Sequence, residues 1–216
     1  MTIWDDRYKS GEGLRWFPSE ELASFLGRTY GPCWPLYERC KDLNAAEIGC
    51  GNGRNLPALF KYGFGFCATD ASVDGLRLAR QVLEDQLEGL SLCVSLIQHA
   101  LPSPLPWPDG RLDLVVDCQT TQHLSWLERA DAYKEVVRVL KRGGRFWMMC
   151  WSGTAHAANR IYGGCYPELD YVTTDELIAV LVESGLKPSL PIRTTRTYPE
   201  LGGVHGEWMV VEAVKP

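Results

Sequence analysis

Apolar and polar residues follow two alternating periods along most of the chain. Short apolar, β-rich runs bounded by turn residues at 43–48, 64–69 and 112–117 predict buried strands. Further strands are expected within 91–97, from Phe146 and over 207–214, and helical spacing occurs at 19–29, 55–62, 72–86, 132–140 and 177–184. Strands that alternate with helices in this way predict an α/β fold with a parallel sheet.

The helical periods also predict which side chains face the core and where two helices begin. Inward positions are expected at Leu22, Phe25 and Leu26 in the first helix and at Leu76, Ala79 and Leu83 in the third. Ser125 with Glu128, and Thr173 with Glu176, have the spacing of capping boxes. Each pair therefore predicts a helix that starts immediately after its serine or threonine.

Three glycines at alternating positions follow the first predicted strand. Gly49, Gly51 and Gly53 come directly after a strand that carries Glu47 near its end, and a helical pattern follows. Glycine at this density gives up stability for backbone geometry. We expect a strand, a tight turn and a helix whose unpaired N–H groups face outward toward a ligand with a negative end.

The spacing of this turn excludes two common nucleotide sites. A dinucleotide fingerprint requires a glycine three residues after Gly51, and that position is Arg54. No Gly-Lys-Ser/Thr sequence follows, so a magnesium triphosphate has neither its lysine nor its hydroxyl. The carboxylate of Glu47 would also repel phosphates.

The pattern Glu-x-Gly-x-Gly-x-Gly resembles motif I of the class I S-adenosylmethionine (SAM)-dependent methyltransferases. In that family the first, acidic residue faces the cationic methionine end of the cofactor. The resemblance implies that the methionine end is bound by Glu47, Gly49, Cys50, Gly51, Asn52, Gly53 and Asn55. The alternative is a glycine turn that serves only to reverse the chain.

A carboxylate also stands at the tip of the second predicted strand. Asp70 can accept hydrogen bonds from both ribose hydroxyls there, with Ala71 and Ser72 beside it as the next helix begins. The alternative is that Asp70 or Ser72 is simply the N-cap of that helix. The two roles can coexist.

Two further segments resemble the same family. The run 105–117 is similar to the family's Leu-Pro-Phe-x-Asp-x-Ser-Phe-Asp-Leu-Val segment, and 139–146 is similar to its Leu-Lys-Pro-Gly-Gly turn, with Arg142 in place of proline. The motifs cover residues 43–150. The resemblance implies a Rossmann-like, seven-stranded, mostly parallel sheet with helices on both faces and an antiparallel last strand.

The N-terminal segment, Trp4-Asp5-Asp6-Arg7-Tyr8, is similar to the start of small bacterial methyltransferases of the tellurite-resistance and thiopurine branch. In those relatives it folds over the cofactor, so residues 1–30 are expected to form a lid and a helix in which Trp4 and Tyr8 contact SAM. The alternative is an aromatic patch packed on the sheet. Adenine is expected near His99, Ala100 and Leu101, with Asp117 and Cys118 below.

Acceptor chemistry is expected beyond the carboxyl ends of the strands, on the rim 117–123 after the fourth strand. His123 is the leading candidate for a general base, and the alternative is a packing or cofactor-contacting role. Cys118-Gln119 invites comparison with cytosine-C5 methyltransferases, but Asp117 replaces their proline. Substrate contacts are expected from Trp16, Gln119, Trp151, His156, Arg160, Tyr162 and Tyr166, the last five within a loop at 151–171.

Composition limits the alternatives. At 216 residues, 45% hydrophobic, the chain suits a single domain, and no apolar run is long enough to cross a bilayer. A net charge of −5 leaves no general basic surface for nucleic acid. The N-terminus lacks a signal-peptide pattern, and the eight cysteines contain no CxxC pair, so we expect a cytoplasmic protein without metal or disulfides.

The sequence therefore predicts a SAM-dependent methyltransferase that acts on a small molecule by in-line displacement and releases S-adenosylhomocysteine. The alternatives are an RNA or protein methyltransferase, or a scaffold protein that binds SAM without turnover. The acceptor atom, whether O, N or S, and the oligomeric state are left open.

Overall fold

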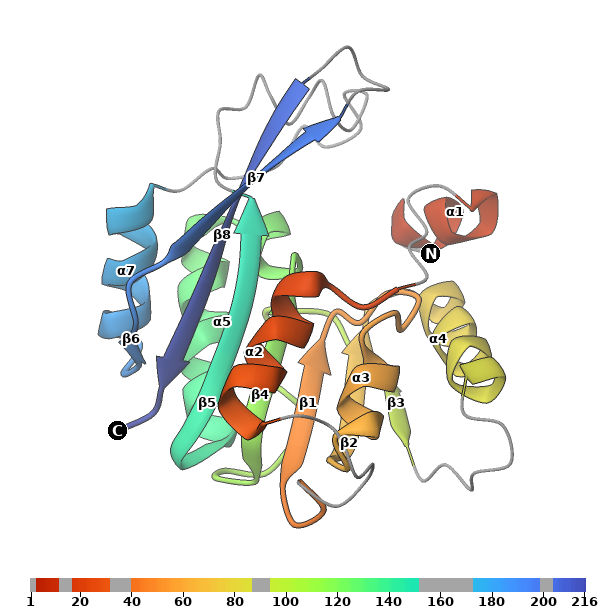
Figure 1. Ribbon diagram of the computed structural model, residues 1–216, viewed down its shortest axis with the longest axis horizontal. Coiled ribbons are helices and arrows are strands. Elements are labelled where there is room, and N and C mark those ends of the chain that lie inside the picture. Colours follow the sequence, from red (N-terminus) through yellow and green to blue (C-terminus); the bar gives the residue numbers. More distant parts are fainter. Residues whose placement is uncertain (1–2, 12–16, 32–39, 87–93, 152–172, 199–203) are drawn as a thin grey trace. The chain divides into compact units, whose positions relative to one another are not determined.

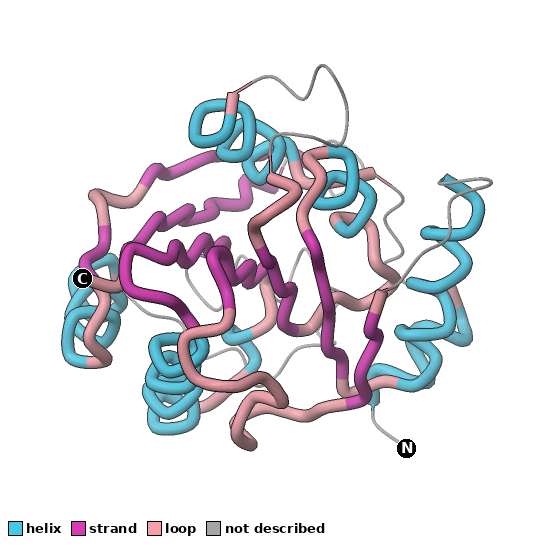
Figure 2. The backbone as a smooth tube through the Cα atoms, turned by 90° about the horizontal axis from the view of Figure 1, so that it is seen from below, coloured by secondary structure: helices cyan, strands magenta, loops and turns pink. Residues whose placement is uncertain are grey.

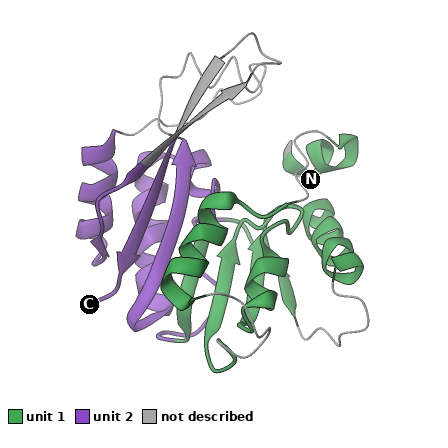
Figure 3. Cartoon of the chain, viewed as in Figure 1, with its two compact units in different colours: residues 1–100, 111–116 green, residues 101–110, 117–216 purple. Residues whose placement is uncertain are grey.

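The chain forms two compact units in the computed structural model (Figures 1 and 3). The first unit holds residues 1–100 and 111–116, and the second holds residues 101–110 and 117–216. The structure describes residues 3–11, 17–31, 40–86, 94–151, 173–198 and 204–216.

The helices and strands follow the alternation that the sequence predicts (Figure 1). The first part of the chain contains α1 (Ile3–Ser10), α2 (Glu20–Tyr30), β1 (Asn44–Ile48), α3 (Leu56–Lys61), β2 (Gly65–Asp70), α4 (Val73–Gln86), β3 (Ser95–Gln98) and β4 (Leu112–Cys118). The remainder contains the 3₁₀ turn η1 (Thr121–His123), α5 (Trp126–Val139), β5 (Leu140–Trp151), α7 (Thr174–Glu183), β6 (Lys187–Pro188), β7 (Ile192–Tyr198) and β8 (Val204–Val214).

The strands form a mixed sheet, which Figure 2 shows together with the helices that connect them. Its hydrogen-bonded order is β3-β2-β1-β4-β5-β8-β6, and β7 pairs with β8 off this path. β1, β2 and β3 are mutually parallel, whereas β8 runs antiparallel to β5, β6 and β7. The predicted seven-stranded, mostly parallel sheet with an antiparallel last strand is confirmed, and β7 is an addition that the sequence did not indicate.

The core of the first unit follows the predicted periodicity with one difference. The apolar residues of β1 and the predicted face of α2 are buried. In α4, Ala79 and Leu83 are buried as predicted, but Leu76 is only half-buried, and Gly75 and Val82 lie inward instead. The helix is rotated because the ring of Tyr8 packs against Gly75 and requires a small residue there.

In the second unit both predicted capping boxes are confirmed. The Ser125 hydroxyl accepts from the main-chain N–H of Glu128 at the start of α5, and Thr173 with Glu176 makes the same arrangement at the start of α7. Each cap satisfies N–H groups that a helix end otherwise leaves without partners. Both helices accordingly begin one residue after their cap.

Arg138 of α5 fastens the segment 101–110 to the second unit. Its guanidinium donates to the carbonyls of Leu105 and Trp107, each at 2.9 Å, and to the carboxylates of Asp109 and Glu135, each at 2.7 Å. Hydrogen bonds to Glu135 and Asp109 raise the pKa of Arg138 further above its usual value. One side chain therefore fixes a segment that has no helix or strand of its own.

We expect Arg138→Met to lower the free energy of unfolding by about 2–3 kcal/mol, because charge-assisted hydrogen bonds are lost and two carbonyls lose their donor. Denaturant unfolding measures the change. Lys134→Met is the matched control, since Lys134 lies one turn earlier on α5 and pairs only with exposed Asp131. Equal effects of the two substitutions would contradict the role given to Arg138.

None of the helices in the described part of the chain has both the length and the apolar character that crossing a bilayer requires.

Candidate functional site

The glycine turn after β1 has the backbone geometry that its sequence predicts. Gly51 and Gly53 have φ angles of 56° and 76°, in the left-handed region that side chains other than glycine rarely adopt. A Cβ atom on Gly53 would also lie 2.8 Å from the Cα of Ala79 in α4. The turn therefore requires glycine at Gly53 both for its conformation and for the close approach of α4.

The expectation of outward-facing, unpaired N–H groups in this turn is wrong. The N–H of Cys50 donates to the carbonyl of Thr69 at 2.8 Å, and that of Gly53 donates to the carbonyl of Cys50 at 2.9 Å. The N–H of Gly51 donates to Oδ2 of Asp70, also at 2.8 Å. Because these donors are used within the unit, the turn is rigid and does not offer them to an anion.

Two buried carboxylates flank the turn instead. Glu47 near the end of β1 is 1% exposed, and Asp70 at the end of β2 is 8% exposed. The side-chain Nδ2 of Asn55 donates to Oε1 of Glu47 at 2.7 Å. Burial, then Asp70 and then Glu47 raise the pKa of the Cys50 thiol between them well above its usual value. The surroundings of the turn therefore favour a cation.

Asp70 organises the ends of β2 and α4. Its Oδ1 accepts from the N–H of Ser72 at 2.8 Å, while Oδ2 accepts from Gly51. Burial raises the pKa of Asp70, the hydrogen bonds from Ser72 and Gly51 oppose that rise, and nearby Asp5 adds to it. Ser72 is the residue that caps α4, since its hydroxyl accepts from the N–H of Gly75 at 3.0 Å. Each oxygen of Asp70 retains capacity for another donor.

Helix α1 packs directly on this part of the first unit. The Ser72 hydroxyl donates to Oδ1 of Asp5 at 2.6 Å. The hydroxyl of Tyr8 occupies the position next to Gly51 where a Cβ would stand, and the Tyr8 ring covers Gly75. The sequence indicated Tyr8 through a resemblance but not Asp5 or Gly75, because neither stands in a recognisable motif.

The remaining predicted cofactor residues fall into both units. His99 follows β3, and its N–H donates to the carbonyl of Asp70 at 2.9 Å, so the first unit brings His99 and Ala100 to the end of β2. Leu101, Asp117 and Cys118 belong to the second unit. The assignment of all five residues to adenine stays a prediction.

In the second unit a buried polar cluster holds the rim after β4. The carboxylate of Asp117 accepts from the hydroxyl of Thr121 and from the N–H of Thr120, the latter at 2.8 Å, and Thr121 lies 3.1 Å from the hydroxyl of Tyr133. Burial raises the pKa of Asp117, whereas the bonds from Thr121 and Thr120 and the charge of Arg129 oppose the rise. Asp117 therefore shapes the turn that leads to His123.

His123 ends that turn beside a buried amide. The N–H of Trp151 donates to Oε1 of Gln122 at 2.8 Å, and Nε2 of Gln122 lies 3.4 Å from Nε2 of His123. Arg129 donates to the carbonyl of Gln122 at 3.3 Å. Gln119 has a φ of 72°, and its N–H donates to the carbonyl of Met149. The rim is thus held from β5 and α5.

Several predicted substrate residues lie outside the described part of the chain, namely Trp16, His156, Arg160, Tyr162 and Tyr166. Of the others, Trp151 is buried at the end of β5 and packs edge-on against Trp208 of β8, with ring centroids 4.6 Å apart. Gln119 lies on the rim after β4. Their contacts with a substrate stay predictions.

A family model described as a methyltransferase domain matches residues 46–148, which include the glycine turn, Asp70 and η1. The chain carries a methyltransferase domain. The prediction of SAM as the cofactor of this domain is confirmed. The finer resemblance to the tellurite-resistance and thiopurine branch stays a prediction.

Known relatives of the methyltransferase domain are distant. The chain is 32% identical to the sterol 24-C-methyltransferase erg6 of Aspergillus fumigatus over 116 residues, which are 51% of this chain and 28% of that protein. The match thus spans little more than a quarter of the relative's length.

Two solved structures share the fold of the methyltransferase domain. The YcgJ protein of Bacillus subtilis superposes with a TM-score of 0.72 at 15% identity over 91% of this chain and 99% of that one. The geranyl diphosphate C-methyltransferase of Streptomyces coelicolor A3(2), solved with geranyl diphosphate, Mg²⁺ and S-adenosylhomocysteine, has a TM-score of 0.67 at 15% identity and covers 91% and 79%. At these identities the likeness shows the fold alone.

Proposed function

We propose that the protein is a SAM-dependent methyltransferase that moves a methyl group to a small molecule. The observation that carries the proposal is the pair of buried carboxylates, Glu47 and Asp70, on either side of a glycine turn that uses its own N–H groups internally. Such a turn suits a ligand with a cationic end and a diol better than a phosphate. The match to a methyltransferase domain supports the same conclusion.

The residues of the first unit fit the chemical groups of SAM. Bound SAM supplies a methyl group already activated by its sulfonium centre. Glu47 would oppose the positive charge of the amino-acid end, and Asp70 would accept hydrogen bonds from the two ribose hydroxyls. The small surface of Gly51 leaves room for close approach, since any Cβ there would meet Tyr8. Catalysis then depends mainly on alignment and on excluding water.

Helix α1 would cover the bound cofactor. Its contacts through Asp5 and Tyr8 hold it against Ser72 and Gly51, beside the carboxylate proposed for the ribose. Trp4 in the same helix stacks with Arg7, whose guanidinium carbon lies 5.5 Å from the centroid of the Trp4 ring. We infer that α1 excludes water from the methionine end.

For the acceptor, His123 is proposed as the general base and Gln119 and Trp151 as substrate contacts. The net charge of −5 favours a small molecule over nucleic acid. The names of two similar proteins, which concern a sterol and geranyl diphosphate, are consistent with a small acceptor.

Transfer of isotope from methyl-labelled SAM tests this function. We expect purified protein to label a component of a small-molecule extract and to produce S-adenosylhomocysteine in equal amount. Labelled RNA or polypeptide alone would support a macromolecular substrate instead. Binding of SAM without transfer to any of the three would support a scaffold, and no binding at all would remove the proposal.

A further inference from the structure

The side chain of Asn55 connects two elements that are remote in sequence. It is 1% exposed and stands at the end of the glycine turn, immediately before α3. Its Oδ1 accepts from the main-chain N–H of Ser19 at 2.9 Å, and its Nδ2 donates to Oε1 of Glu47 at 2.7 Å. A single buried amide thus bridges the start of α2 and the acidic residue of β1.

The chemistry of the two partners fixes the orientation of this amide. A main-chain N–H can only donate, and an ionised carboxylate can only accept. Rotating the carboxamide of Asn55 by half a turn would set its NH₂ against the N–H of Ser19 and its oxygen against Glu47. The bridge therefore has one favourable arrangement, in which the Nδ2 of Asn55 restrains the Glu47 carboxylate.

Asn55 makes this bridge in place of the role that asparagine commonly has at its position. Asparagine at a helix N-cap normally accepts from an N–H of the first turn. Asn55 is the N-cap of α3, yet its side chain makes no capping bond, and its backbone is in the right-handed helical region. Pro57 in the first turn also removes one N–H that a cap would serve. The capping of α3 therefore does not explain an asparagine here.

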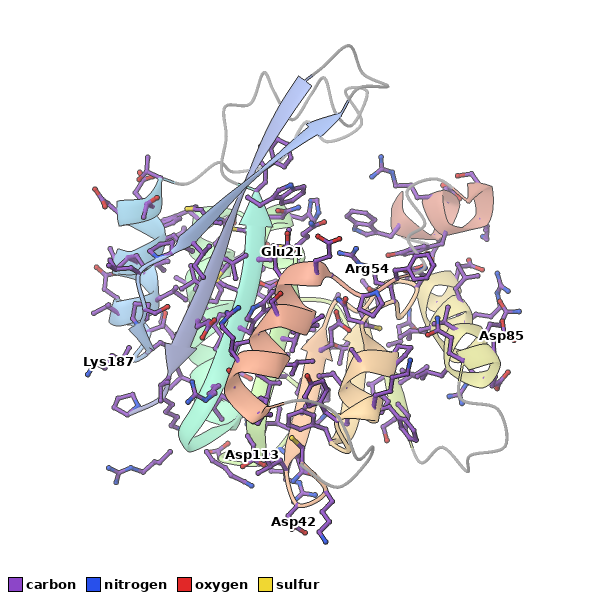
Figure 4. All side chains as sticks on the ribbon, in the orientation of Figure 1. Glu21, Asp42, Arg54, Asp85, Asp113 and Lys187 are labelled. Carbon is purple, nitrogen blue, oxygen red and sulfur yellow. The ribbon has the colours of Figure 1, made fainter. Side chains whose placement is uncertain are left out.

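The other end of the bridge ties the first turn of α2 to the glycine turn. Ser19 is the N-cap of α2 and is 4% exposed, and its hydroxyl donates to Glu21 at 2.6 Å, so only its main-chain N–H is directed to Asn55. Figure 4 shows Glu21 and Arg54 at the same end of the first unit, opposite Asp42 and Asp113. This end is the one at which β1 and β2 present Glu47 and Asp70.

We propose that Asn55 is a positioning residue for Glu47, rather than a cofactor contact in its own right. It holds the carboxylate in the orientation that meets the amino-acid end of the ligand. The inference rests on the proposed function, because it takes Glu47 as the group that faces this end.

Two ligands that differ only at the amino-acid end provide the test. S-adenosylhomocysteine carries the amino-acid end, and 5′-methylthioadenosine retains the adenosine but lacks it. We expect Asn55→Leu, which keeps the approximate shape of asparagine, to weaken S-adenosylhomocysteine about tenfold in titration calorimetry, because a hydrogen bond to a charged group is lost. Affinity for 5′-methylthioadenosine should change less than about twofold.

A double-mutant cycle sharpens the assignment. In a Glu47→Gln background the amino-acid end no longer faces a charge, so adding Asn55→Leu should cause little further loss for S-adenosylhomocysteine. Asn55→Asp is the second variant and serves if the leucine variant fails to fold. It keeps the acceptor for Ser19 but sets a like charge beside Glu47, so it too should weaken only the ligand with the amino-acid end.

Equal weakening of both ligands would show that Asn55 acts through general stability of the turn, and unchanged affinity for both would show that it does not act on binding. Either result overturns the positioning role while leaving the proposed function intact. If the unaltered protein binds neither ligand, the proposed function itself fails, and the inference fails with it.

Discussion

Asp70→Ala weakens the binding of S-adenosylhomocysteine by about a hundredfold to ten-thousandfold, if Asp70 accepts both ribose hydroxyls as proposed. Each hydrogen bond to a charged acceptor contributes about 1.5–3 kcal/mol, and about 1.4 kcal/mol corresponds to a factor of ten. Titration calorimetry measures the change. Part of the loss comes from the turn, because Asp70 also holds the N–H groups of Gly51 and Ser72.

A nearby carboxylate provides the control. Asp74 lies in the first turn of α4 and pairs with Lys9 and Arg77 at the surface, so Asp74→Ala should leave the affinity within about twofold. Similar losses in the two variants would mean that the ribose is bound elsewhere.

The pH dependence gives an independent check on Asp70. Its pKa is raised in the folded protein, mainly by burial, so protonation begins at a higher pH than for an ordinary aspartate. A protonated Asp70 offers fewer acceptors, and affinity should therefore fall as the pH is lowered toward this raised pKa. Asp70→Asn cannot be protonated in this range, and its pH profile should be correspondingly flatter.

His123→Ala reduces kcat by about a hundredfold to ten-thousandfold if the imidazole is the general base, because this is the usual contribution of a positioned base. The affinity for S-adenosylhomocysteine should stay within about twofold, since the proposed role concerns only the acceptor. Single-turnover methyl transfer, together with calorimetry, separates the two effects. Loss of binding without loss of kcat would move His123 from the acceptor to the cofactor.

Gln122 makes the histidine experiment more specific. Its Oε1 accepts from the N–H of Trp151, which directs its Nε2 toward His123. Where that Nε2 donates, the facing nitrogen of His123 must be the acceptor, so the imidazole is neutral with its proton on Nδ1. A base working through Nε2 would then exchange the amide of Gln122 for the proton of the acceptor.

Much of the fold followed from local signals. The period of apolar residues gave the strands and helices, and the spacing of Ser125 with Glu128 and of Thr173 with Glu176 located two helix starts to the residue. Asp70 could be found because carboxyl ends of parallel strands meet at one edge of a sheet. These features depend on residues close together in sequence or on a general rule of topology.

The parts that could not be predicted depend on contacts between distant residues. The N–H of Gly51 is used by a carboxylate 19 residues later, so the availability of the turn's donors could not be known from the turn itself. The pairing of Asp5 with Ser72 spans 67 residues, and the amide of Asn55 reaches back 36 residues to Ser19. No local pattern records such partners.

The seat of Tyr8 links the evolutionary choices open to two positions. A Cβ on Gly75 would lie 2.9 Å from the Tyr8 ring, and a helix that retains glycine there forgoes about 0.5–1 kcal/mol relative to alanine. A lineage that lost the aromatic ring could therefore exchange Gly75 for alanine and gain a stiffer α4. Gly51 would not gain the same freedom, because its left-handed backbone would persist after the ring had gone.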